Sequence, residues 1–204
     1  HIKNAKMDHA HVGIMTRSCF YQLRQLRTIR QSLSDDATRM LIHSFVVTRV
    51  DYCNSVLSGI TVVQTDRVQR ILNAAARLLL RIPKFAPVAA LIPDHLHWLP
   101  ATQRIRFKIL LLVSKCIHQR TPSYLQELGV PVSTVVGRRS LRSADQYCLI
   151  VPRCRSSSMQ RRGFSAAGPM AWNSLPAATR VQIAANINIS KQLIKTYLFD
   201  RDKK

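Results

Sequence analysis

Few residues of this chain have the types and spacing that catalysis requires, and the acidic pair Asp35 and Asp36 is the first of them. A catalytic metal pair needs carboxylate oxygens that converge on one point. Adjacent residues of a helix instead point about 100° apart. Ser34 precedes the pair, so its hydroxyl can cap the free amides of a helix start while the carboxylates face the positive end of the dipole. The triplet therefore predicts a helix beginning near Ser34 rather than a metal site.

A second candidate site is Asp94, His95 and His97, in a segment bounded by prolines. Acid–base or metal chemistry would need a further ligand, and none lies near them in the sequence. Cys148 and Cys154 match no zinc pattern, and there is neither a glycine-rich phosphate loop nor a G-x-S-x-G turn. The sequence therefore predicts a chain that is not an enzyme on its own and that holds no metal and no cofactor. An enzyme that uses Asp94, His95 and His97 is the alternative.

The charge of the chain is far from ordinary: 31 Lys and Arg residues against 10 Asp and Glu residues give a net charge of +21 in 204 residues. Such self-repulsion favours a polyanionic partner. No apolar run approaches the length of a membrane span, and no apolar secretion signal follows His1, which also suggests a piece of a longer reading frame. The five cysteines include no C-x-x-C pair. We expect an intracellular protein, cytoplasmic or nuclear and not secreted, with reduced thiols and no membrane partner.

The cations are also ordered along the chain. Residues 66–82 (DRVQRILNAAARLLLRI) place arginines on one stripe of a helix and apolar side chains on the opposite side. Residues 101–120 (ATQRIRFKILLLVSKCIHQR) repeat the pattern. The cations of the two stripes are Arg67, Arg70, Arg77 and Arg81, then Arg104, Lys108 and Lys115. A helix that is apolar behind and cationic in front packs on a core and presents its charges to a polyanion; a solvated polar face is the alternative.

A third basic cluster follows in residues 138–162, where seven arginines accompany one acid, Asp145. Tyr147 and Phe164 lie among them or at their edge, so base stacking could join the neutralisation of phosphates. The first members are the candidates for nucleic-acid contacts: Arg138, Arg139 and Arg142. A solvated basic hairpin is an equally good interpretation.

Helices must position most of these residues. Residues 1–16 have weak periodicity and predict a loose start, and a helix is expected over 17–30. The helix that starts at Ser34 is apolar on nearly all sides and predicts a central core helix to about Leu57, ending at Ser58-Gly59. The two striped helices follow, separated by a proline-rich connector.

The character of the chain changes after Pro131. Residues 138–155 predict one or two short strands, residues 164–176 a turn and a short helix, and residues 190–199 a terminal helix with Leu193, Ile194 and Tyr197 inward. Trp98 and Trp172 are expected to be core anchors. We therefore predict a mainly α fold: a multi-helix basic domain over 1–130, and a small α+β segment, arginine-rich, over 131–204.

Six blocks of the sequence, in this order, resemble a known family. They are SCFYQLRQLRTIR, RVDYCNSVLSG, LNAAARLL, HWLPATQRIRFKILLLV, RSLRSA and FSAAGPMAWNSLP. Together they resemble the region after the catalytic palm, the thumb and C-terminal extension, in reverse transcriptases of non-LTR (LINE-type) retrotransposons. The catalytic turn of that family, an aromatic residue followed by Ala-Asp-Asp, has no counterpart in this sequence.

The resemblance implies a helical thumb that grips the template–primer duplex behind the active site of an RNA-directed DNA polymerase. On this chain the grip would be made by the two cationic stripes. The implied partners are an RNA–DNA or DNA duplex, held by its backbone, and the missing palm and fingers domain. The alternative is a degenerate, transposon-derived fragment with no retained activity or only a protein-interaction role.

Overall fold

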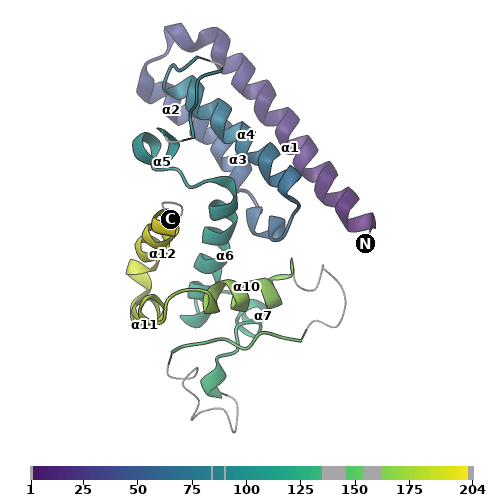
Figure 1. Ribbon diagram of the computed structural model, residues 1–204, viewed down its shortest axis with the longest axis vertical. Coiled ribbons are helices and arrows are strands. Elements are labelled where there is room, and N and C mark those ends of the chain that lie inside the picture. The colour runs from purple at the N-terminus through teal and green to yellow at the C-terminus, as the bar shows by residue number, and fades with distance from the viewer. Residues whose placement is uncertain (1, 84, 90, 135–145, 154–161, 202–204) are drawn as a thin grey trace. The chain divides into compact units, whose positions relative to one another are not determined.

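The structure, a computed structural model, describes residues 2–83, 85–89, 91–134, 146–153 and 162–201 (Figure 1). The chain forms two compact units, His1–Arg104 and Ile105–Lys204, which are described separately below. Both units are built from helices, so the prediction of a mainly α fold is confirmed. The predicted division into domains 1–130 and 131–204 stays a prediction.

The first unit consists of helices joined by short turns. Its elements are α1 (Ile2–Ile29), a 3-10 turn (Arg30–Ser32), α2 (Asp35–Ile42), a π-helical turn (His43–Val47), α3 (Thr48–Asp51), a 3-10 turn (Asn54–Leu57), α4 (Val62–Leu79) and α5 (Leu91–Leu96). Helices α1 and α4 lie side by side in this unit (Figure 1).

The core between α1 and α4 follows from helical spacing. The buried face of α1 and the buried face of α4 both recur every three or four residues, so each helix presents one apolar stripe to the other. The α1 residues are Val12, Met15, Cys19, Leu23 and Leu26. The α4 residues include Val68, Ile71, Leu72, Ala75 and Leu79, the apolar face that the sequence predicts. Each such large side chain contributes about 1.5–3 kcal/mol on full burial.

The expectation of a loose start over residues 1–16 is wrong, because α1 already begins at Ile2. Val12 and Met15 continue the spacing of Cys19 and Leu23, and all four are buried. The apolar stripe therefore extends beyond the residues on which the sequence prediction depended.

The predicted cap at Ser34 is confirmed: its Oγ accepts a hydrogen bond from the Ala37 amide at 3.2 Å. The single helix expected to continue to Leu57 is wrong, since a π-helical turn and a left-handed residue, Cys53 (φ 51°), interrupt it. Its apolar residues are not all internal either, because Met40 is 66% exposed. The chain does turn at Gly59, whose φ of 67° suits a residue without a Cβ.

Both cationic helices end earlier than the sequence predicts, and for the same reason. At the end of α4, Arg81 is left-handed (φ 56°) and the Ile82 amide donates to the Arg77 carbonyl at 3.0 Å. At the end of α6 (Ala101–Ile117), Gln119 is left-handed (φ 56°) and the Arg120 amide donates to the Lys115 carbonyl at 2.8 Å. This pattern closes a helix C-terminus, and glycine is its usual left-handed residue. Neither sequence has that glycine, so the stops were not predicted.

The second unit is also helical in the part of it that the structure describes, and Trp172 belongs to its core. Besides most of α6 it contains α7 (Ser123–Gln126), a 3-10 turn (Val132–Thr134), α10 (Phe164–Asn173), α11 (Ala177–Ala185) and α12 (Ile187–Arg201). Trp172 is fully buried and its Nε1 donates to the Tyr147 carbonyl at 2.7 Å, which confirms it as a core anchor. Ile194 is buried on α12, as predicted, whereas α11 was not anticipated from the sequence.

The strands expected over 138–155 lie largely outside the described residues. In the described part of that region there is one isolated antiparallel bridge, between Pro131 and Leu149. The α+β character of the C-terminal segment therefore stays a prediction. None of the helices in the described ranges combines the length and the apolar character that crossing a membrane requires.

Candidate nucleic-acid interface

A groove lined by arginines lies between α1 and α4 in the first unit. Arg24 and Arg27 on α1 face it together with Arg70 and Arg77 on α4, around a cavity of about 570 Å³. We call this cavity the arginine groove. Arg24, Arg27 and Arg70 are exposed, so the groove opens to solvent, and no acid is among the described residues that line it. The packing of α1 on α4 thus gathers cations from two distant stretches of sequence.

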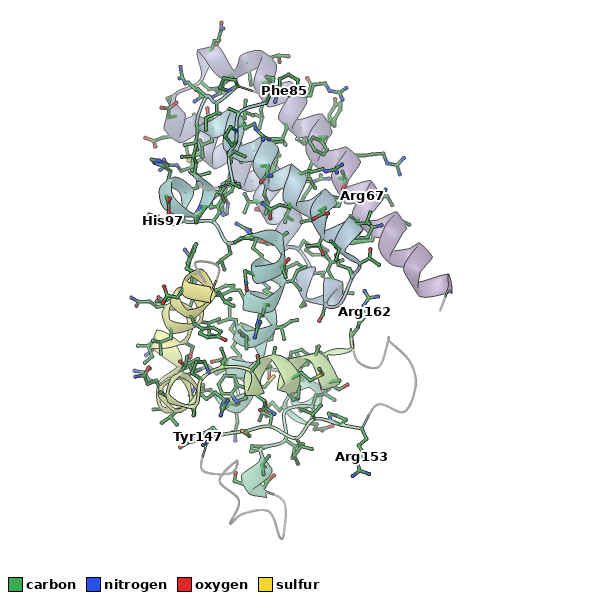
Figure 2. All side chains as sticks on the ribbon, viewed as in Figure 1. Arg67, Phe85, His97, Tyr147, Arg153 and Arg162 are labelled. Atoms are coloured by element: carbon green, nitrogen blue, oxygen red, sulfur yellow. The ribbon has the colours of Figure 1, made fainter. Side chains whose placement is uncertain are left out.

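The arginine groove is lined by apolar side chains as well as by cations. Phe20 and Leu23 from α1 and Ala74 from α4 line it, together with the amide side chain of Asn73. Phe85, from the connector after α4, lines the same groove and is 90% exposed. In Figure 2 Phe85 and Arg67 lie toward opposite ends of α4. The lining of the groove therefore combines arginines with apolar side chains, one of them the exposed Phe85.

A second hollow of about 490 Å³ continues the first, because Arg27 and Arg77 line both. It extends past the end of α4 to Arg30 and Arg81. In the part of the chain that the structure describes, no acidic residue lines this hollow either. The two hollows together give a continuous cationic path along the α1–α4 pair.

The arginines of this path differ in how many hydrogen bonds and ion pairs they form with the rest of the protein. Among the residues that the structure describes, Arg24, Arg27 and Arg70 form no ion pair. Arg77 donates twice to the Ala86 carbonyl, from Nε at 3.2 Å and from Nη2 at 3.1 Å, which fixes its side chain against the connector.

Asp35 is the acid nearest the path, and it binds two of its arginines. Arg30 donates to the Asp35 carboxylate at 2.5 Å and Arg81 at 3.2 Å. The bonds from Arg30 first and then from Arg81 hold the pKa of Asp35 below its ordinary value. Arg81 remains 62% exposed, but its charge is partly compensated. The strongest positive potential is therefore expected near Arg24, Arg27 and Arg70.

The arginines predicted on α4 are only partly brought together. Arg70 and Arg77 line the arginine groove, as the stripe requires. Arg81 lies beyond the end of the helix and borders the second hollow only. Arg67 is half-buried on α4 and lines neither hollow (Figure 2).

Arg104 occupies an internal position in the first unit. It donates from Nη1 to the Asp51 carboxylate at 2.5 Å and from Nε to the Leu99 carbonyl at 3.2 Å, and its side chain is only 12% exposed. Its guanidinium also lies 5.9 Å from the centre of the Trp98 ring. These contacts tie the start of α6 to the end of α3, and they make Arg104 a structural cation.

The other predicted cations belong to the second unit or lie outside the description. Lys108 is half-buried and Lys115 is exposed on α6. Arg138, Arg139 and Arg142 lie outside the described residues, so their roles stay predictions.

Sequence reasoning missed Arg24 and Arg27 as site residues. They follow Leu23 and Leu26, which point into the core, and so flank the buried stripe of α1. Their position beside the apolar edge of a predicted helix could have identified them as candidate site residues. Their meeting with Arg70 depends on the packing of α1 against α4, which the sequence alone does not specify.

Within the described ranges, no three His, Cys, Asp or Glu side chains gather as a metal site would require. Asp94 and His95 lie on α5, and His97 follows it in a left-handed conformation (φ 51°). Cys19, Cys53, Cys116 and Cys148 are free thiols in the structure.

Comparison with models of protein families, with curated proteins and with solved structures finds no match for this chain. The likeness to LINE-type reverse transcriptases thus rests on the six sequence blocks, and it stays a prediction.

Proposed function

We propose that this chain is the non-catalytic, nucleic-acid-binding part of a non-LTR retrotransposon reverse transcriptase. In this proposal it grips the template–primer duplex, RNA–DNA or DNA, through contacts to phosphates. The single observation that carries the proposal is the arginine groove, where two helices bring four arginines together with no acid among the described residues that line it. The ordered sequence blocks support the proposed family, and the arginine groove supports the proposed binding of phosphates.

The choice of arginine fits phosphate binding. A guanidinium group is always charged and presents a planar fork of donors that matches two phosphate oxygens. Arg24, Arg27 and Arg70 are exposed and form no ion pair with other described residues. Phosphate contacts position a protein on nucleic acid without reading its sequence. That property suits a thumb, because a polymerase must move along any template.

The proposed partners include the palm and fingers of the parent polymerase, and the proposed location is the cytoplasm or nucleus.

A specific observation also favours the second candidate, a degenerate fragment with only a protein-interaction role. Four large apolar side chains between residues 52 and 63 are more than 60% exposed: Tyr52, Val56, Val62 and Val63. If these side chains form one continuous patch, a protein partner would be expected to cover it.

Charge reversal in the arginine groove tests the proposed function. The variant Arg24→Glu with Arg70→Glu is compared with Arg39→Glu plus Lys191→Glu, which has the same change in net charge. Arg39 and Lys191 are exposed and line neither hollow. We expect the groove variant to lose at least about tenfold in affinity for an RNA–DNA duplex in fluorescence anisotropy, because counterion release at the phosphates is lost. The control should retain most of its affinity.

Circular dichroism of both variants should match the parent protein, since all four side chains are exposed. Equal losses of affinity in the two variants would mean that only net charge matters, and the groove would not be the interface. Size-exclusion chromatography, with and without duplex, distinguishes the protein-interaction role from the nucleic-acid-binding function. A protein that self-associates with and without duplex, and whose elution duplex does not change, would favour the protein-interaction role.

A further inference from the structure

The arginine groove is lined by a neutral polar side chain, that of Asn73, as well as by its arginines. Two hydrogen bonds in sequence decide which end of the Asn73 amide a ligand can meet. The backbone amide of Ala101, at the start of α6, donates to Gln69 Oε1 at 2.8 Å. Gln69 Nε2 then donates to Asn73 Oδ1 at 2.8 Å, one turn further along α4.

The direction of both hydrogen bonds follows from the backbone amide. A backbone N–H can only donate, so the Gln69 atom that it reaches is the oxygen, and the other end of Gln69 is the NH2 group. That NH2 group can only donate, so it reaches the oxygen of Asn73. Asn73 Nδ2 remains, and it donates to no other residue in the part of the chain that the structure describes. Asn73 therefore offers a ligand a donor rather than an acceptor.

The polar side chains that line the groove, among the residues described, therefore all offer donors. The guanidinium groups of its four arginines have no acceptor, and Asn73 adds its Nδ2. Such a lining suits a group whose oxygens only accept hydrogen bonds. A terminal phosphate monoester is such a group, with a charge of about −1.5 to −2 near pH 7. A phosphodiester inside a strand carries only a single negative charge.

The shape of the groove also favours a strand end. A phosphodiester continues into a sugar on both sides, whereas a terminal phosphate is attached on one side and can enter a hollow of about 570 Å³. Arg24, Arg27 and Arg70 are exposed and form no ion pair with other described residues, so they can balance the additional charge.

We infer that the arginine groove binds the terminal phosphate monoester of a nucleic-acid strand, and that Asn73 contributes to this specificity with a donor that Gln69 orients. The inference deepens the proposed function and rests on it, because it names the part of the nucleic acid that enters the groove. The same phosphate chemistry is also carried by inorganic phosphate and by phosphorylated proteins, so the experiment includes both.

RNA–DNA duplexes of one sequence that differ only at their strand ends test the inference in fluorescence anisotropy. The ends are hydroxyl groups, a 5′-phosphate, a 3′-phosphate, or the methyl diester of either phosphate. We expect a terminal phosphate to raise affinity about tenfold over hydroxyl ends, as hydrogen bonds to a charged group do. The methyl diester should lose most of this gain, because it carries one charge like the internal phosphates. The readout is the ratio of the two affinities, which we call the end ratio.

Variants of Asn73 test its donor. Asn73→Ala removes the donor without changing charge, and it should lower the end ratio about threefold or more. Asn73→Asp replaces the donor by a charged acceptor and should bring the end ratio close to one. Gln25→Glu is the matched control, since it makes the same change in charge at an exposed position of α1 that lines neither hollow. The control should keep the end ratio of the parent protein.

A variant of Gln69 tests its positioning role. Gln69→Met has similar length and no polar group, so it frees the Asn73 amide to turn over without changing charge. We expect a lower end ratio. Adding Gln69→Met to Asn73→Ala should lower the end ratio no further, because Gln69 acts through Asn73. Additive losses would overturn this part of the inference. Circular dichroism checks that each variant folds.

The outcomes separate the inference from the proposed function. Duplex binding with an end ratio near one, or an end ratio that Asn73→Ala does not lower, would overturn the inference and leave the duplex grip intact. An Asn73-dependent gain at strand ends without binding of hydroxyl-ended duplex would support the inference and refute the duplex grip. Inorganic phosphate and a phosphoserine peptide serve as competitors. Tighter binding of either than of the phosphate-ended duplex would overturn the assignment to a strand end, and weaker binding would support it.

Discussion

Removal of Arg30 should destabilise the first unit, because this buried guanidinium joins the ends of α1, α2 and α4. It is 7% exposed, and it donates to the carbonyls of Leu78 at 3.2 Å, Leu79 at 3.4 Å and Leu33 at 3.0 Å, and to Asp35. In Arg30→Ala the Leu78 and Leu79 carbonyls lose a charged donor, at about 1–3 kcal/mol for each buried group left unsatisfied. Asp35 is 68% exposed and rehydrates, so its ion pair adds little.

We therefore expect the free energy of unfolding to fall by about 2–4 kcal/mol in Arg30→Ala, measured by urea denaturation followed by circular dichroism. Two variants separate the causes. Asp35→Asn, which removes the ion pair only, should cost much less than Arg30→Ala, because the Asp35 carboxylate is exposed and solvent screens the pair. Arg24→Ala, at an exposed site on the same helix, should stay within about 0.5 kcal/mol of the parent. An Arg30→Ala variant as stable as Arg24→Ala would refute the assignment of a structural role to Arg30.

Three further predictions concern other sites. Arg104→Ala should lower the free energy of unfolding by about 2 kcal/mol in urea, since it leaves Asp51 and the Leu99 carbonyl without their donor; no change would return Arg104 to the candidate interface. The pKa of Asp35 is lowered by its bonds to Arg30 and Arg81, so the stabilising effect of the Asp35 carboxylate is present at neutral pH and is lost as pH falls below about 4. Asp35→Asn should remove that part of the acid sensitivity in thermal melts measured over a series of pH values. Identical pH profiles for the variant and the parent protein would contradict this prediction. Gln119→Gly should raise the free energy of unfolding by up to about 1 kcal/mol. Glycine relieves left-handed strain of about 1–2 kcal/mol at this position and costs about 0.5–1 kcal/mol of chain entropy. A loss of stability would contradict the left-handed motif that ends α6.

Local chemistry made several elements predictable. Ser34 with its two following acids specified a helix start, and the spacing of Val68, Ile71 and Ala75 specified the buried face of α4. Both signals depend on residues within a few positions of one another. The same reasoning failed between His43 and Tyr52, where an apolar run predicted an unbroken helix. The π-helical turn and the exposure of Met40 depend on which neighbours pack there, and the run itself contains no marker of either.

The candidate site was also predictable only in part, because helical periodicity relates residues that are close in the sequence and not residues on different helices. Helical periodicity placed Arg70 and Arg77 on one stripe, and both line the arginine groove. It could not show that Arg77 would bind the Ala86 carbonyl or that Arg104 would pair with Asp51. Nor could it bring Arg24 to Arg70, since they lie 46 positions apart in the sequence and only the packing of α1 on α4 joins them.

The most direct measurement of the phosphate grip is the salt dependence of duplex binding. Each phosphate neutralised on a duplex contributes about −0.9 to the slope of log K against log salt, so four groove arginines predict a slope of about −3.6 or steeper. Arg24→Gln with Arg70→Gln should make the slope shallower by about 1.8, whereas Arg39→Gln with Lys191→Gln should leave it unchanged. An unaltered slope in the groove variant, or affinity that does not depend on salt, would contradict the grip.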